Sequence, residues 1–185
     1  TTLPSTEPEE LAQMAQFKAE EYIPFNAERH VISHGILRQD EVRGSDVLIT
    51  AVDRPVIGRA LSILHEAKLE PTVAEVSSVA LVRSITLNNE EAMQEPSLLI
   101  LNIGRSQTDI NILKDGLLVA TRSHSHGIER LHREIERARE ENPEGDPRDI
   151  EADKTHLWVD RIIRFTRQTY EFAVREHEVS DTSHL

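Results

Sequence analysis

Residues 97–121 read SLLILNIGRSQTDINILKDGLLVAT, and this stretch decides the fold class of the second half of the chain. The run 97–103 is apolar enough for a strand that is buried on both faces, and residues 108–113 alternate between apolar and polar side chains. An Asp-Gly dipeptide at 115–116 predicts a tight hairpin turn, because both residues tolerate the backbone angles that such a turn needs. Residues 117–121 supply the next strand, so the stretch predicts a three-stranded meander.

Two helices are predicted after this meander. The charged segment 127–141 has helical composition, the loop 142–148 contains two prolines and a glycine, and a long helix follows over 153–177. The apolar stripe predicted for the long helix is Val159, Ile162, Ile163, Thr166, Tyr170, Ala173 and Val174. Three meandering strands followed by helices are the order of one lobe of a ribonuclease-H-like or actin-like fold.

The first half predicts a separate, smaller α/β region. Thr6 and Glu9 have capping-box spacing at the start of a helix that ends before Pro24. Residues 31–37 and 46–52 are predicted to form two strands.

A second helix is predicted after these strands, with Asp53 as its cap and Pro55 in its first turn. Its predicted apolar face consists of Ile57, Ala60, Leu61, Leu64 and Ala67. A short strand at 72–76 and a helix at 77–86 follow, and the polar segment 88–96 is the best internal boundary. The predicted domains are therefore 1–70, a connecting region 71–96, and 97–185.

Composition restricts the partners of the protein. The chain has 185 residues, a formal net charge of -12 and no cysteine. A surface this acidic repels phosphate backbones and anionic lipids, so nucleic acid is not expected as a partner. Without cysteine there are no disulfides and no thiolate metal sites. No apolar run has the length of about 20 residues that crosses a bilayer, so direct membrane insertion is not expected. The first ten residues lack the features of a signal peptide, and the missing initiator Met suggests a piece of a longer protein.

Two stretches of the chain resemble the PilM family of bacterial type IV pilus machines. The first is EEYIPF at 20–25, which follows a helix as the similar phrase does in that family. The second is NIGRSQTDI at 102–110, together with the Asp-Gly turn, a strand ending at Arg122 and a glycine at 127 before a helix. Residues 80–83, ALVR, are similar to the family's helix between its two lobes, so the resemblance covers most of residues 3–131.

The resemblance implies a mixed α/β fold. Residues 1–70 would be the small subdomain that PilM and FtsA insert into an actin-like lobe, and 97–185 would belong to a second, partial lobe. It further implies a cytoplasmic scaffold, peripheral to the inner membrane, that holds the short cytoplasmic tail of a PilN-type protein and communicates with pilus motor ATPases. Tyr22, Ile23 and Phe25 are the expected partner-binding residues, although such a cluster at a helix end is more often core.

The second stretch departs from the phosphate hairpin of actin-like ATPases, which usually reads Asp-x-Gly-x-x-Thr. Gly104 stands in place, but Asn102 replaces the Asp that orders magnesium, and Gln107 replaces the Thr. Thr108 is expected to point to the opposite face of its strand, and Asp109 alone does not make a site. The remaining nucleotide loops are missing from the sequence. We therefore expect no ATPase activity and no cofactor, with ATP and magnesium binding possible only in a longer parent protein.

His124 and His126 would share a strand face if the strand extends that far, and they are weak candidates for metal ligands. The alternative, a solvated strand end, is favoured because no acidic ligand stands at motif spacing, so no metal is predicted. Other functions also stay open: a nucleotide-gated switch, a type II secretion L-type protein or an FtsA-type division protein. A homodimer is compatible with the strand edges that a partial lobe exposes.

Overall fold

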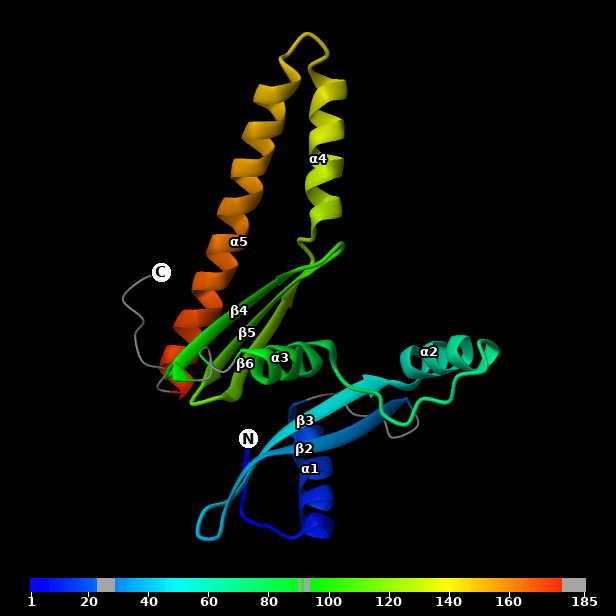
Figure 1. Cartoon of the computed structure of the whole chain (residues 1–185), viewed down its shortest axis with the longest axis vertical. Helices are drawn as coiled ribbons and strands as arrows, with labels where there is room; N and C mark the ends of the chain where they lie inside the picture. Colours follow the sequence, from blue (N-terminus) through cyan, green and yellow to red (C-terminus); the bar gives the residue numbers. More distant parts are fainter. Residues whose placement is uncertain (23–28, 90, 92–93, 178–185) are drawn as a thin grey trace. The chain divides into compact units, whose positions relative to one another are not determined.

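The structure is a computed structural model, and it describes residues 1–22, 29–89, 91 and 94–177. The chain divides into two units, Thr1–Val76 and Ser77–Leu185. Each unit contains a three-stranded antiparallel sheet with helices (Figure 1), which confirms the predicted mixed α/β class. The division falls inside the predicted connecting region, and the assignment of the units to an inserted subdomain and an actin-like lobe stays a prediction.

The first unit is built around a long β-hairpin. Its elements in chain order are β1 (Thr2–Leu3), α1 (Pro8–Tyr22), β2 (His30–Asp40), β3 (Gly44–Asp53) and α2 (Arg54–Glu66). The strand order is β1-β3-β2, so β3 is central. Both hairpin strands are longer than predicted, because antiparallel pairing continues through a register shift between Ile36 and Arg38 to the turn before Gly44.

The core of the first unit lies between α1 and the sheet. Leu11 and Ala15, four residues apart on α1, are buried against Leu3 of β1 and Val47 of β3. Met14 and Ile49 pack around this cluster. This face of α1 therefore forms the core of the first unit, whereas Tyr22, the last residue of the helix, is exposed.

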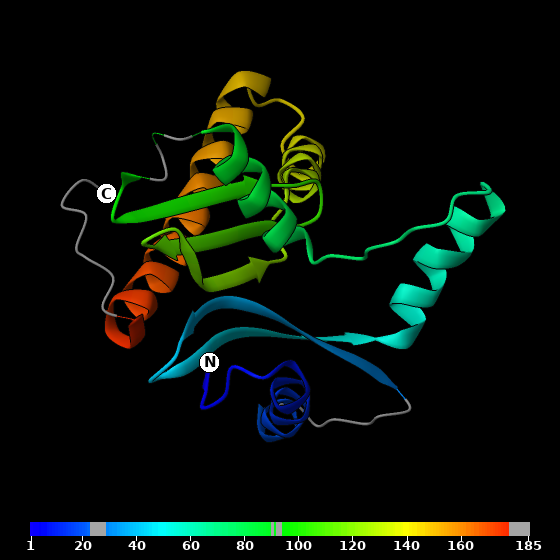
Figure 2. The ribbon, with the colours of Figure 1, turned by 60° about the horizontal axis from the view of Figure 1, so that its bottom comes forward.

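The second unit places its meander between two helices. The elements are α3 (Ser77–Asn88), β4 (Ser97–Ile103), β5 (Thr108–Lys114), β6 (Leu117–His124), α4 (Ile128–Glu141) and α5 (Pro147–His177). The three predicted strands are confirmed, and the sheet order is β4-β5-β6. Figure 2 shows α3 and α5 on opposite faces of this sheet, and both helices contact β5 and β6. The central strand β5 is consequently buried on both faces despite its alternating sequence.

Beyond the sheet, α4 and α5 form a helical hairpin (Figure 1). A cluster of Leu131, Ile135, Trp158 and Ile162 holds the two helices together. The stripe predicted for α5 is wrong at Val159 and Ile163, which are exposed. The true stripe is rotated toward Trp158, the large side chain that the prediction left out.

Three boundaries differ from the prediction. Residues 72–76 form no strand in the structure. Helix α5 begins at Pro147, not at 153, because the Asp146 carboxylate accepts the Arg148 N–H at 2.8 Å and proline suits a first helical position. Helix α1 begins at Pro8, two residues after the predicted cap.

Candidate functional site

The predicted partner-binding residues stand at the end of α1. Tyr22 is the last residue of that helix and is 75% exposed. It lies on the same helical face as the buried Ala15, two turns closer to the C-terminal end of α1. The Lys18 ammonium lies 5.4 Å from the centre of the Tyr22 ring and pairs with Glu21 at 2.6 Å. Ile23 and Phe25 lie outside the described residues.

A second exposed aromatic residue, Phe17, stands on the same helix and is 70% exposed. Sequence reasoning missed it, because it lies off the apolar stripe of α1 and no motif marks it. Phe17 and Tyr22 are five residues apart, about 140° around the helix, so the two rings lie on different sides of α1 and do not form one surface. The exposed Tyr22 ring is the apolar surface at the end of α1 that a partner can contact.

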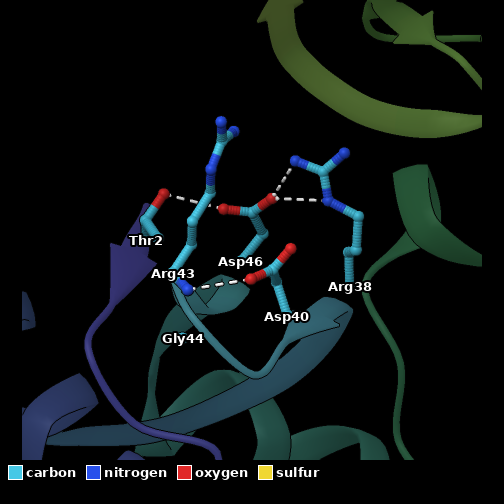
Figure 3. Close-up of a pocket in the computed structure, with 6 residues that line it drawn as sticks. All are labelled: Thr2, Arg38, Asp40, Arg43, Gly44 and Asp46. Atoms are coloured by element: carbon cyan, nitrogen blue, oxygen red, sulfur yellow. Dashed lines mark hydrogen bonds and ion pairs between the residues drawn. The ribbon is translucent and has the colours of Figure 1, made fainter.

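The first unit also contains a polar surface pocket that the sequence did not predict. It has a volume of about 180 Å³ and is lined by Thr2, Arg38, Asp40, Arg43, Gly44 and Asp46 (Figure 3). The Asp46 carboxylate accepts hydrogen bonds from the Thr2 hydroxyl at 2.7 Å and from the Arg38 guanidinium at 2.8 and 3.1 Å. These contacts hold the pKa of Asp46 below its usual value despite partial burial, and the hydrogen bond from Thr2 has the largest effect.

The turn beside this pocket is fixed by the Asp40 side chain, which accepts the backbone N–H groups of Val42 and Arg43 at 2.8 and 2.9 Å. The same two hydrogen bonds lower the pKa of Asp40. Figure 3 shows the Arg43 side chain extending away from the turn with its guanidinium clear of Asp46. The pocket thus contains two arginines and two carboxylates, and the spacing of these residues in the sequence matches no recognisable motif.

The phosphate-hairpin position lies in the loop between β4 and β5. The Gly104 N–H donates to the Gln107 carbonyl at 2.9 Å, which closes the loop on itself. The side chains of Asn102 and Gln107 both donate to the buried Asp109 carboxylate, at 3.4 and 2.9 Å. The Ser123 hydroxyl donates to the same carboxylate at 2.5 Å. Asn102 and Gln107, which stand in place of the Asp and Thr of the phosphate hairpin, thus donate their side-chain hydrogen bonds to the buried Asp109 carboxylate.

Thr108 lies on the opposite face of β5, as strand alternation predicts, and its hydroxyl donates to the His126 carbonyl at 2.8 Å. Asn111 is buried on the Asp109 face, where its side-chain oxygen accepts the Thr121 hydroxyl at 2.8 Å. The amide nitrogen of Asn111 is buried without a partner in the described part of the chain. Of the polar residues on this face of the sheet, the sequence singled out only Asp109. Single Ser, Thr and Asn residues in strands follow no motif that marks them as a cluster.

The loop carbonyls also cap helix α4. The N–H groups of Ile128 and Glu129 donate to the carbonyls of Gly104 and Arg105, at 3.0 and 2.9 Å. A Cβ atom on Gly127 would lie 2.2 Å from the Arg105 carbonyl oxygen, so only glycine permits this close approach. The Arg105 guanidinium pairs with Glu129 at 3.1 Å and lowers the pKa of that carboxyl. The helix N-terminus is therefore occupied by the protein's own backbone.

The two candidate metal ligands are packed against α5. The ring of His124 stacks on Phe165 with centroids 4.0 Å apart, and His126 meets the same ring edge-on at 4.9 Å. Burial lowers the pKa of both histidines, with smaller contributions from Arg122 at His124 and from Arg130 and Arg161 at His126. Within the described ranges, no group of three or more His, Cys, Asp or Glu side chains is arranged to hold a metal ion.

In the part of the chain that the structure describes, no helix combines the length and the hydropathy needed to cross a membrane.

Comparison with known proteins identifies a family and a solved structure with a similar fold. The family model described as type IV pilus assembly protein PilM matches residues 4–148. A solved structure described as a PilM–PilN type IV pilus biogenesis complex has a similar fold, with a TM-score of 0.77 and 20% identity over 96% of this chain. The chain spans 55% of that protein's length.

A second solved structure is described as a protein with an actin-like ATPase fold and unknown function from Bacteroides thetaiotaomicron. It shares 17% identity and has a TM-score of 0.39, with 72% of this chain and 47% of that protein covered. A similarity this low supports no inference about the function of this chain.

Proposed function

Because the chain belongs to the family of the type IV pilus assembly protein PilM, we propose that it is a scaffold that binds the cytoplasmic tail of a PilN-type membrane protein. The similar solved structure is a complex of PilM with PilN, and this likeness supports the proposed partner. The protein would work in the cytoplasm, held at the inner membrane through that partner, and would bind without hydrolysing ATP. Contact with pilus motor ATPases belongs to the same proposal.

The exposure of Tyr22 is the observation that carries the proposal. A tyrosine at the end of an amphipathic helix is usually part of the core, but this ring is 75% exposed while Leu11 and Ala15 of the same face are buried. Burying such a ring against a partner removes apolar surface from water and contributes up to about 3 kcal/mol. The phrase in which Tyr22 stands, residues 20–25, lies within the part of the chain that the PilM family model matches.

The loop between β4 and β5 supports binding without nucleotide hydrolysis. Phosphate binding in actin-like hairpins needs free backbone N–H groups and a carboxylate that orders magnesium. Here the Gly104 N–H bonds to Gln107, and the side chains of Asn102 and Gln107 donate to Asp109. The first turn of α4 is likewise saturated by loop carbonyls.

A thermal unfolding titration tests the proposal. The purified chain is titrated with a synthetic peptide of the cytoplasmic tail of a PilN-type protein, and in parallel with magnesium-ATP. A ligand that binds only the folded state raises the unfolding midpoint by mass action. We expect a rise with the peptide and none with magnesium-ATP. A midpoint raised by ATP at sub-millimolar concentration would instead support the nucleotide-gated switch.

Matched variants locate the peptide site. Tyr22→Ala should weaken peptide binding about tenfold or more, since truncating an exposed aromatic anchor costs over about 1.4 kcal/mol. Val42→Ala is the control, because Val42 is a fully exposed apolar residue of the same unit at the hairpin turn. Asn102→Ala should leave peptide affinity unchanged, and Phe25→Ala should weaken it more than Asn102→Ala does. Equal losses in Tyr22→Ala and Val42→Ala would exclude the end of α1 as the site.

A further inference from the structure

A row of polar side chains crosses the sheet of the first unit at the base of the polar pocket. Asp46 of β3 is the register partner of Thr2 on β1 and of Arg38 on β2. Val47, the next residue of β3, is buried in the cluster with Leu11 of α1. Because side chains alternate along a strand, Asp46 and its two partners project from the face of the sheet opposite to α1.

The turn between β2 and β3 adds a second arginine to this pocket. The Asp40 carboxylate accepts the backbone N–H groups of Val42 and Arg43, and Gly44 follows with a φ of +92°. These contacts hold the backbone from which the Arg43 side chain extends. Figure 3 shows both arginine side chains reaching past the Asp46 carboxylate, one on each side of it. The pocket is therefore flanked by two guanidinium groups.

Unused hydrogen-bond donors outnumber unused acceptors in this pocket. Asp46 accepts from Thr2 with one oxygen and from Arg38 with the other. Arg38 donates through Nε and Nη2, so its Nη1 stays unused within the described residues. Over the same residues the Arg43 guanidinium makes no hydrogen bond or ion pair, and the unused acceptor is the second oxygen of Asp40. Since a guanidinium has several donors and no acceptor, the pocket suits a ligand with acceptor oxygens.

Size and charge restrict that ligand further. The pocket volume of about 180 Å³ is below the roughly 300 Å³ at which pockets begin to enclose a whole small molecule, so it has room for the end of one side chain. The formal charges of its two arginines and two carboxylates cancel. A phosphate carries close to two negative charges, which Asp40 and Asp46 would repel. A carboxylate carries only one and is therefore favoured.

We propose that this pocket binds the carboxylate of an acidic side chain, aspartate or glutamate, on a partner protein. The Arg43 guanidinium offers two parallel N–H groups, which match the two oxygens of a carboxylate, and Nη1 of Arg38 adds a further donor. Arg38 is already held by Asp46, so it loses little freedom when the ligand binds. The site shares no residue with the end of α1, so this inference goes beyond the proposed function and neither depends on the other.

An NMR titration of the full chain tests the charge of the ligand. The probe is the capped tripeptide acetyl-Gly-Glu-Gly-amide, and its matched control has glutamine in place of glutamate, which removes the charge and keeps the shape. The backbone N–H signals of Val42 and Gly44 should move with the glutamate peptide and saturate at about 1–50 mM, as expected for one ion pair at a partly exposed site. The glutamine peptide should bind at least about tenfold more weakly. Equal binding of the two peptides would overturn the proposal.

Two arginine variants locate the binding site. Arg43→Gln should weaken binding of the glutamate peptide at least about fivefold, because it removes the guanidinium that has no partner within the described residues. Arg43 is exposed, so the amide spectrum away from the turn should stay unchanged and show that the variant is folded. Arg59→Gln is the matched control, since Arg59 is an exposed arginine of α2 in the same unit and does not line the pocket. Equal peptide affinity of the two variants would contradict the proposed site.

Two small anions distinguish the source of the oxygen atoms. Propionate carries the carboxylate of a glutamate side chain without a peptide, and it should move the same N–H signals with no higher affinity than the glutamate peptide. Inorganic phosphate at pH 7.5 and equal ionic strength should bind at least about threefold more weakly than that peptide. Tighter binding of phosphate would identify a phosphate site. Binding of propionate without binding of the peptide would mean that the pocket does not accept a side chain of a protein, and either result would overturn the proposal.

Discussion

Single residues fix the turns on which each unit depends, and Gly44 is the strictest case. Its φ is +92°, in the region that L side chains rarely adopt. A Cβ atom there would lie 2.1 Å from the Leu3 carbonyl oxygen, so β1 could not stay beside the turn. Only glycine at position 44 therefore allows strand β1 to lie beside the hairpin turn.

Gly44→Ala should destabilise the first unit by at least about 2 kcal/mol, because strain and overlap act together. Amide hydrogen exchange of β2 and β3 measures this, as the only tryptophan lies in the second unit. Gly58→Ala is the control: Gly58 lies inside α2, and apart from its chain neighbours and the helix's own backbone no atom stands within 4 Å of the place that its added methyl group would take. Replacing a mid-helix glycine by alanine should stabilise by about 0.5–1 kcal/mol. Similar protection in both variants would contradict this account of the turn.

For single residues, the sequence predicts which kind of side chain caps a helix better than it predicts which residue does so. Thr6 and Glu9 have capping-box spacing, yet the start of α1 is held by Ser5, whose hydroxyl donates to Glu10 at 2.6 Å and accepts the Glu7 N–H at 3.1 Å. The residue three positions after Ser5 is Pro8, so Ser5 has no capping-box spacing, and its partner Glu10 stands five residues away. The capping-box pattern therefore could not identify Ser5.

Among the secondary structure elements, α5 shows how neighbours select a helical face. Ile162 is 5% exposed in the cluster with Trp158, whereas Ile163 beside it is 51% exposed. Both residues are isoleucine, and both were predicted to belong to the apolar stripe of α5. A wide apolar stripe gives the period of a helix but not its rotation, which depends on where α4 and the sheet lie. Helix type was therefore predictable, and the choice of buried residues was not.

Ile162→Ala should lower the free energy of unfolding of the second unit by about 2–4 kcal/mol, through lost burial and the cavity that it leaves. Ile163→Ala, with the identical change in side chain, should cost less than about 0.5 kcal/mol. Urea unfolding followed by Trp158 fluorescence compares the two. Equal costs would place both residues in the core and contradict the observed rotation of α5.

The contact of β6 with α5 predicts a pH dependence. His124 stacks on Phe165 with its Nε2 atom buried and without a partner in the described part of the chain. The pKa of His124 is lowered in the folded state, so the neutral ring is the form that folding favours. Stability from this contact is therefore complete above the unfolded pKa of about 6.5 and is lost as the pH falls toward the lower, folded value.

Between pH 7.5 and 5.5 the urea midpoint of the second unit should fall, and His124→Phe should reduce that fall while keeping the stacked ring. Part of the fall in the urea midpoint should remain in His124→Phe, because the pKa of His126 is lowered as well. The charged groups that act on the His126 ring are Arg130, Arg161 and Glu134. The carboxylates Asp46 and Glu134 do not add to this fall, because their lowered pKa values move their titration further below this window. His156→Gln on the exposed side of α5 is the control. An unchanged slope in His124→Phe would exclude this stack as its source.

For the whole molecule, net charge makes a prediction that no single site makes. The formal charge of -12 should prevent binding to DNA, even though Arg130, Arg133 and Arg137 line one shallow depression on α4. Fluorescence anisotropy with a labelled duplex at about 50 mM salt should show no binding, because electrostatic attraction provides nearly all non-specific affinity. A salt-sensitive rise in anisotropy at micromolar protein would show that the arginine face outweighs the overall charge.

At the scale of the whole chain, the fold class and the family could be predicted, because both depend on strand order and on two short stretches of sequence. The family match over residues 4–148 includes both stretches. The sites could be predicted only in part. Tyr22 is exposed as the partner hypothesis requires, but the pocket around Asp46 joins residues from β1, β2 and β3 that no local pattern connects. Contacts between distant segments arise from the fold itself.

The hairpin of α4 and α5 has a mechanical consequence. About 16 residues of α5 lie between its start and Ile162, so the arm beyond that point is about 24 Å long at 1.5 Å per residue. Its base is joined to the sheet through Gly127 and the ring stack on Phe165. By simple leverage, a tilt of about 10° at that base displaces the tip by about 4 Å over such a length. A small tilt at the end of β6 would therefore move the loop around Gly145 by several ångströms, about the size of an atom or more.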